Sequence, residues 1–225
     1  LIVSFLLTRN MLIVIALCID NQIGRFNKSS LSYQTLMEIL ISGFDDSQII
    51  TLVGEEDDIP DISSWVGVKV TDENHVTTIS WSGKKLEGSL RLEMLPDTVT
   101  TANFASNKLS GTVDLRSLPP VLKELVLYGN NFTGSLDLTC LPESMTSLNV
   151  YGNKLSGSLD FTMLPNGIKD MYMGNNRFSG EAIFTDLPES LTYLDVTKSA
   201  VSGEVVQIPE RRLQVGDSNV RIIHE

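Results

Sequence analysis

The residues best suited to chemistry in this chain are tyrosines that recur at nearly equal intervals. Four of the five tyrosines in the sequence follow this spacing: Tyr128, Tyr151, Tyr172 and Tyr193. Tyrosine offers a large, rigid contact surface with a polar tip, and it is enriched at binding hot spots. Polar residues at related positions complete the predicted binding surface: Glu124, Asn149, Asp170 and Asp195. The alternative is that tyrosine simply suits a strand and pairs across it.

Residues for catalysis do not form a recognisable pattern. The two histidines, His75 and His224, lie at opposite ends of the region that carries the tyrosines, and no Ser/His/Asp, H-E-x-x-H or phosphate-binding glycine motif occurs. The carboxylate pair to weigh is Asp170 with Asp195. Such clustered aspartates would suit cleavage of an acidic sugar on a parallel β-helix, which is the alternative architecture. We therefore predict no catalytic residue, no metal site and no cofactor.

A second set of carboxylates recurs at a constant interval, at Asp114, Asp137 and Asp160. A ladder of bound cations is one interpretation of this column. A solvated outer surface is the interpretation that we favour, because exposed charges of like sign are tolerated at modest cost.

A repeat positions all of these residues. From Val76 the chain falls into consecutive 23-residue units, such as LKELVLYGNNFTGSLDLTCLPES followed by MTSLNVYGNKLSGSLDFTMLPNG. Periods of 20 to 50 residues indicate a stacked, quasi-one-dimensional fold. The alternation of Leu125 and Leu127 with polar residues predicts a short strand in each unit, and Leu136 and Leu138 predict a second extended segment.

An asparagine follows the predicted strand in the four central units: Asn107, Asn130, Asn153 and Asn176. A chain that turns sharply away from a strand leaves backbone groups unpaired, and an inward amide can both donate to and accept from them. An unpaired buried backbone group costs about 1–3 kcal/mol, so these residues are predicted to form a structural ladder.

These positions match the pattern L-x-x-L-x-L-x-x-N-x-L-S-G, and the chain resembles the leucine-rich-repeat family. The L-S-G continuation is similar to the plant-type variant, and Trp65, Gly67 and Val68 resemble the start of its N-terminal cap, with Val70 where a cysteine belongs. Similar repeats occur in surface proteins of protists. The resemblance implies an α/β solenoid, mostly β, shaped as a horseshoe of about six 23-residue coils with a helical N-terminal cap. It also implies that the tyrosines and their polar neighbours lie on the concave face.

Four regions are expected along the chain. Residues 1–19 are an apolar segment of the signal or anchor type, which would permit membrane association. Residues 20–75 form the cap region, with a helix after the Ser-rich start and a solvated acidic loop around Pro60. Residues 76–213 form the solenoid, and residues 214–225 form a tail or weak cap.

Charge and composition narrow the class of partner. The formal net charge is −11, and a surface of that sign repels nucleic acid; it serves solubility, with a cationic partner as the alternative. Two cysteines make no disulfide framework, and the candidate glycosylation sites are Asn27 and Asn131. We expect a secreted or cell-surface binding module for a protein or glycan. The alternatives are the ectodomain of a larger receptor and a structural surface protein without a specific ligand.

Overall fold

The computed structural model describes residues 28–54 and 59–224. The predicted signal or anchor segment, residues 1–19, and the candidate glycosylation site Asn27 lie outside the described residues. Within the described part of the chain, no helix has both the length and the apolar character needed to cross a membrane.

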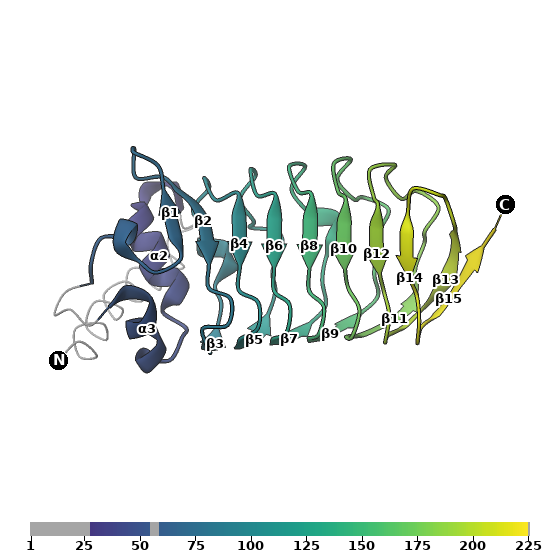
Figure 1. Cartoon of the computed structure of the whole chain (residues 1–225), viewed down its shortest axis with the longest axis horizontal. Coiled ribbons are helices and arrows are strands. Elements are labelled where there is room, and N and C mark those ends of the chain that lie inside the picture. Colours follow the sequence, from purple (N-terminus) through teal and green to yellow (C-terminus); the bar gives the residue numbers. More distant parts are fainter. Residues whose placement is uncertain (1–27, 55–58, 225) are drawn as a thin grey trace, which may run out of the picture.

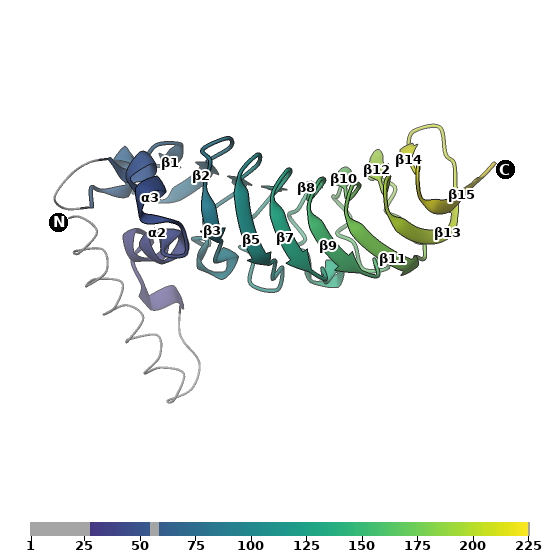
Figure 2. The same cartoon turned by 90° about the horizontal axis from the view of Figure 1, so that it is seen from below.

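Two separate sheets extend along the whole length of the solenoid (Figures 1 and 2). The first sheet contains β1 (Val68–Val70), β2 (Val76–Ser80), β4 (Thr101–Asn103), β6 (Glu124–Val126), β8 (Ser147–Asn149), β10 (Asp170–Tyr172), β12 (Tyr193–Asp195) and β14 (Arg212–Gln214). The second contains β3 (Glu87–Ser89), β5 (Lys108–Thr112), β7 (Asn131–Gly134), β9 (Lys154–Gly157), β11 (Arg177–Glu181), β13 (Ala200–Val206) and β15 (Asn219–Ile223). The predicted solenoid with a helical N-terminal cap is confirmed.

The constant period of the repeat sets the register of the first sheet. Thr78 pairs with Thr101, and the same offset carries the pairing on through Glu124, Ser147 and Asp170 to Tyr193. Tyr193 then pairs with Arg212, which is a shorter step along the chain than the preceding ones. Within the described residues, the first sheet thus contains seven parallel strands, from β2 to β14, where about six coils were expected. Strand β15 of the second sheet lies in the segment that was expected to form a tail or weak cap.

The second strand of the central coils lies earlier than the alternation of Leu136 and Leu138 predicts. In the unit that starts at Leu122, β7 covers Asn131–Gly134, and Leu138–Cys140 form a 3-10 helix. The carboxylate of Asp137 accepts a hydrogen bond from the N–H of Thr139 at 3.3 Å, which favours the start of a helical turn over a strand. The other short helices are Lys28–Ser30, Ile62–Ser64 and Leu92–Met94.

The core lies between the two sheets and is filled by the repeated apolar positions. In one coil Leu122, Leu125 and Leu127 are fully buried, and Phe132 enters from the second sheet with 1% of its surface exposed. A single coil has no other side against which to bury these residues, so stacking is what stabilises each unit.

The cap region consists of α2 (Tyr33–Ile41) and α3 (Asp46–Val53), which sit at the N-terminal end of the solenoid (Figure 1). The predicted helix is α2, and the Ser32 hydroxyl accepts a hydrogen bond from the N–H of Thr35. The prediction of a solvated loop before Pro60 was wrong for α3, which buries Ile49, Leu52 and Val53.

Aromatic residues join the cap to the first coils without a disulfide among the described residues. Trp81 is fully buried, its ring lies edge-on to Phe44 and Phe104, and its indole N–H donates to the carbonyl of Val66 at 2.7 Å. Strand β1 pairs antiparallel with β2 and closes this edge of the first sheet.

Candidate functional site

The predicted binding residues lie on the outer surface of the first sheet, which we call the tyrosine face. Two columns of side chains point outward from the strands, and a third follows just after each strand. The first column contains Glu124, Ser147, Asp170, Tyr193 and Arg212. The second contains Val126, Asn149, Tyr172, Asp195 and Gln214. The third contains Tyr128, Tyr151, Gly174 and Thr197, each just beyond its counterpart in the second.

The tyrosines form two ring contacts across neighbouring strands. The rings of Tyr128 and Tyr151 have centroids 5.9 Å apart, and those of Tyr172 and Tyr193 have centroids 4.6 Å apart. The guanidinium of Arg212 lies over the ring of Tyr193, 5.7 Å from its centroid. Tyr128 is 43% exposed and the other three rings are half-buried. The four rings therefore cross the face diagonally, from the third column to the first.

Burial and charge act together on the phenol of Tyr193. Its pKa is raised, first by burial and then by the negative charge of Asp195, while Arg212 lowers it. Tyr172 and Tyr151 contribute to the same rise. The structure thus brings Tyr151, Tyr172, Tyr193 and Asp195 into one cluster. Glu124 stands apart from it, two strands from Asp170 in the same column.

Two residues that contact this cluster were not predicted from the sequence, Arg212 and Gly174. Arg212 was missed because the last step of the register is shorter than the period of the repeat, which hides its place after Tyr193. Gly174 was not singled out, because glycine carries no side chain that could bind a partner. A Cβ at Gly174 would lie 2.6 Å from Oδ1 of Asp195 and 2.6 Å from Oγ1 of Thr197, so only glycine leaves room for those two side chains.

The four asparagines after the first strands connect adjacent coils through the backbone. The amide of Asn130 donates to the carbonyls of Phe104 at 2.9 Å and Leu127 at 3.0 Å, and its oxygen accepts from the N–H of Leu109 at 3.0 Å. Asn107, Asn153 and Asn176 repeat this arrangement in their own coils. The amides bond to the backbone of their own coil and the preceding one, and they do not bond to one another.

The aspartate column is used for local turns. Asp114, Asp137 and Asp160 each accept a hydrogen bond from the backbone N–H two residues later. Hydrogen bonds from Thr139 and Thr162 lower the pKa of Asp137 and of Asp160. Among the described residues, no group of three or more His, Cys, Asp and Glu side chains is placed to hold a metal ion.

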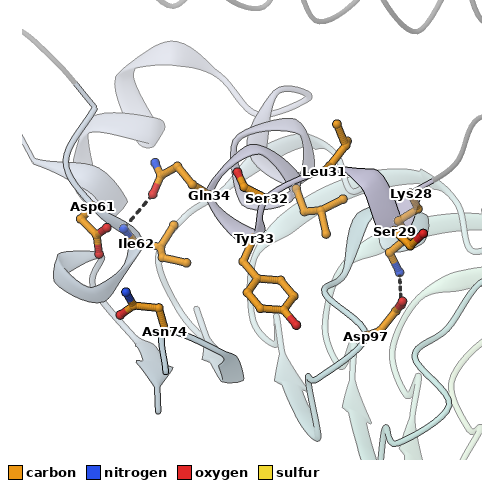
Figure 3. Close-up of a pocket in the computed structure, with 11 residues that line it drawn as sticks. Lys28, Ser29, Leu31, Ser32, Tyr33, Gln34, Asp61, Ile62, Asn74 and Asp97 are labelled. Carbon is orange, nitrogen blue, oxygen red and sulfur yellow. Dashed lines mark hydrogen bonds and ion pairs between the residues drawn. The ribbon is translucent and has the colours of Figure 1, made fainter. Parts of the chain in front are cut away.

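A separate pocket of about 450 Å³ lies between the cap and the first coils (Figure 3). The Lys28 ammonium bonds to Asp97 at 2.6 Å on one side, and the Gln34 amide oxygen accepts from the N–H of Ile62 at 2.9 Å on the other. Tyr33, the fifth tyrosine, lines it. None of the predicted binding residues lines this pocket. Its polar contacts hold the cap together and join it to the first coil.

Comparison with known proteins identifies the fold. No protein-family model and no curated protein match the sequence. The crystal structure of Pollen Receptor Kinase 3 matches with a TM-score of 0.65 at 20% identity, over 83% of this chain and 95% of that chain. The LRR ectodomain of the receptor kinase SOBIR1 from Arabidopsis thaliana matches with a TM-score of 0.60 at 20% identity, over 77% and 97%. The BIR3–SERK2 complex from Arabidopsis thaliana matches with a TM-score of 0.54 at 20% identity, over 74% and 93%. The chain therefore has the fold of the leucine-rich-repeat ectodomains.

Proposed function

We propose that this chain is a non-catalytic binding module that recognises a protein partner through the tyrosine face. The observation that carries the proposal is the diagonal of four tyrosines across four successive strands, with Asp170, Asp195 and Asn149 beside it. Aromatic residues of this kind dominate the energetics of protein interfaces. The fold alone would not support the proposal, because one fold hosts unrelated functions.

Ring packing favours a peptide or protein segment over a glycan. A sugar ring would need an open aromatic face on which to lie. The rings of Tyr172 and Tyr193 are 4.6 Å apart and tilted by 33°, so they cover part of each other's faces and present their edges and hydroxyls. Edges and hydroxyls suit hydrogen bonding and packing against side chains.

The location that goes with this function is outside the cell. The matched structures include a receptor-kinase ectodomain and a complex between two proteins, so an ectodomain role is a natural extension of the proposal. Asn131, the second candidate glycosylation site, begins β7 and is half-buried, and we include its modification in the proposal. If the tyrosine face binds nothing specific, the alternative function, a structural surface protein without a ligand, takes the place of this proposal.

Selection of peptides from a displayed random library against the full-length protein tests the proposal. Affinities of the selected peptides are then measured for the wild type, the double variant Tyr151→Ala with Tyr172→Ala, and the single variant Tyr33→Ala. A hot-spot tyrosine is worth about 2 kcal/mol or more, which is about 30-fold in affinity, so we expect at least that loss in the double variant. Tyr33→Ala removes the fifth tyrosine, which lies at the cap, and should bind like the wild type.

Unfolding curves separate binding from structure. Loss of a ring contact costs about 0.5–1.5 kcal/mol beyond the buried area, so the double variant should stay folded. If it unfolds instead, the variant Tyr151→Phe with Tyr172→Phe, which keeps the rings and removes the hydroxyls, takes its place. Unchanged affinity in both double variants contradicts the proposal.

A further inference from the structure

Asp195 is a buried carboxylate on the tyrosine face whose charge is not needed by the fold. Only 6% of its surface is exposed. Its Oδ1 accepts a hydrogen bond from the N–H of Thr197 at 2.8 Å. Asn103 and Asn149 occupy the same column in other coils, and each accepts the same bond, from Ala105 at 3.0 Å and from Tyr151 at 3.1 Å. A neutral amide therefore meets the local structural need at this position, and the negative charge is additional.

No cation of the chain neutralises this carboxylate within the described residues. The ion pairs found there do not include Asp195. Every fully buried side-chain oxygen in the described part of the chain has a hydrogen-bond partner. The hydrogen bond from Thr197 goes to Oδ1 of Asp195, so Oδ2 of Asp195 is accessible from the surface. A charge held at such low exposure is costly unless a partner pairs with it.

The surroundings of Asp195 suit a cationic side chain. Tyr172 is its direct neighbour in the column, and Tyr193 lies close enough for the Asp195 charge to raise the pKa of the phenol. The guanidinium of Arg212 already lies over the ring of Tyr193, which shows that this ring accepts a cation. Gly174 leaves the space that the carboxylate occupies.

We propose that Asp195, together with Tyr172 and Tyr193, binds an arginine or lysine side chain of the peptide segment that the tyrosine face recognises. The inference rests on the proposed function and adds the chemical class of the ligand's anchoring residue. The carboxylate supplies the charge, and the two phenol rings exclude water from the ion pair.

The test compares charged and neutral forms of one peptide on matched variants. Selected peptides that contain arginine or lysine are resynthesised with citrulline or acetyl-lysine at that position. The wild type should bind the charged form at least tenfold more tightly. Asp195→Asn, which retains the acceptor that Asn103 and Asn149 provide, should bind both forms equally, and Gly174→Ala, which displaces the carboxylate, should reduce the preference. Asp114→Asn removes a charge just after β5 of the second sheet, outside the tyrosine face, and should retain the preference.

The outcomes separate this inference from the proposed function. If Asp195→Asn keeps the full preference for the charged peptide while the tyrosine double variant loses binding, the cation site is wrong and the tyrosine face stands. If the tyrosine variants also bind normally, both proposals are wrong. Should Asp195→Asn fold poorly, the comparison of charged with neutral peptide on the wild type still decides, because equal affinities contradict the cation site.

Discussion

Replacing Asn130 by alanine tests whether the asparagine ladder stabilises the solenoid. The side chain is 7% exposed, so water does not readily replace its contacts. The N–H of Leu109 would lose its acceptor, the Asn130 oxygen at 3.0 Å. The carbonyls of Phe104 and Leu127 would each lose one donor, although Asn107 and Asn153 still donate to them.

The magnitude follows from these contacts. An orphaned buried N–H costs about 1–3 kcal/mol, and each lost bond to a carbonyl that keeps another donor costs about 0.5–1.5 kcal/mol. We therefore expect Asn130→Ala to lower the free energy of unfolding by about 2–6 kcal/mol. Urea unfolding at equilibrium measures this loss, as a lower midpoint with an unchanged slope.

The neighbouring residue supplies a matched control. Asn131 is half-buried at the start of β7, and its side chain makes no hydrogen bond with the described part of the chain. In unglycosylated protein, the same substitution there, Asn131→Ala, should change the free energy of unfolding by no more than about 0.5 kcal/mol. Equal effects at Asn130 and Asn131 would refute the reasoning, because they would show that the buried backbone groups find other partners.

Two further predictions concern the attachment of the cap and the stability of the protein at acidic pH. Gly88 has a φ of +106°, and a Cβ there would lie 2.0 Å from the carbonyl oxygen of Gly43, so Gly88→Ala should loosen the cap and speed amide exchange around Phe44. Gly111→Ala, with a φ of +94° but no atom nearer than 3.8 Å, should cost only the backbone strain of about 1–3 kcal/mol, and equal exchange at Phe44 in the two variants would contradict this account. Folding lowers the pKa of Asp137 and of Asp160, so their contribution is complete above the unfolded value of about 3.9 and is lost as the pH falls through the folded values. Urea midpoints measured from pH 7 to pH 3 should therefore fall less for Asp137→Asn with Asp160→Asn than for the wild type, and parallel profiles would show that the two aspartates contribute nothing.

The period of the repeat made the pairing of the predicted residues accessible from sequence. Because the coils stack with each residue opposite its equivalent in the next unit, Asp170 could be placed opposite Tyr193 and Tyr172 opposite Asp195. The ring contacts between those strands could not be predicted from the sequence, because they depend on side-chain rotamers, which the alternation of strand residues does not determine.

Regions without the strict period were harder to predict. The acidic residues around α3 outweighed the helical spacing of Ile49, Leu52 and Val53, although that spacing was visible. The final rung is reached by a shorter step than the repeat provides, so Arg212 was not recognised as the next member of the column that contains Tyr193. The structural interchangeability of Asp195 with Asn103 and Asn149 became apparent only from their shared hydrogen bond.

The diagonal arrangement of the four tyrosines limits the length of the partner segment that can contact all of them at once. Tyr128 and Tyr193 are separated by three strand spacings of about 4.8 Å across the sheet and by four residues of about 3.3 Å along the strand direction. Together these give a span of about 20 Å. An extended chain covers that span with about six residues. Each coil would then contribute a single anchor, and one short loop or terminus of a partner would be long enough to touch all four.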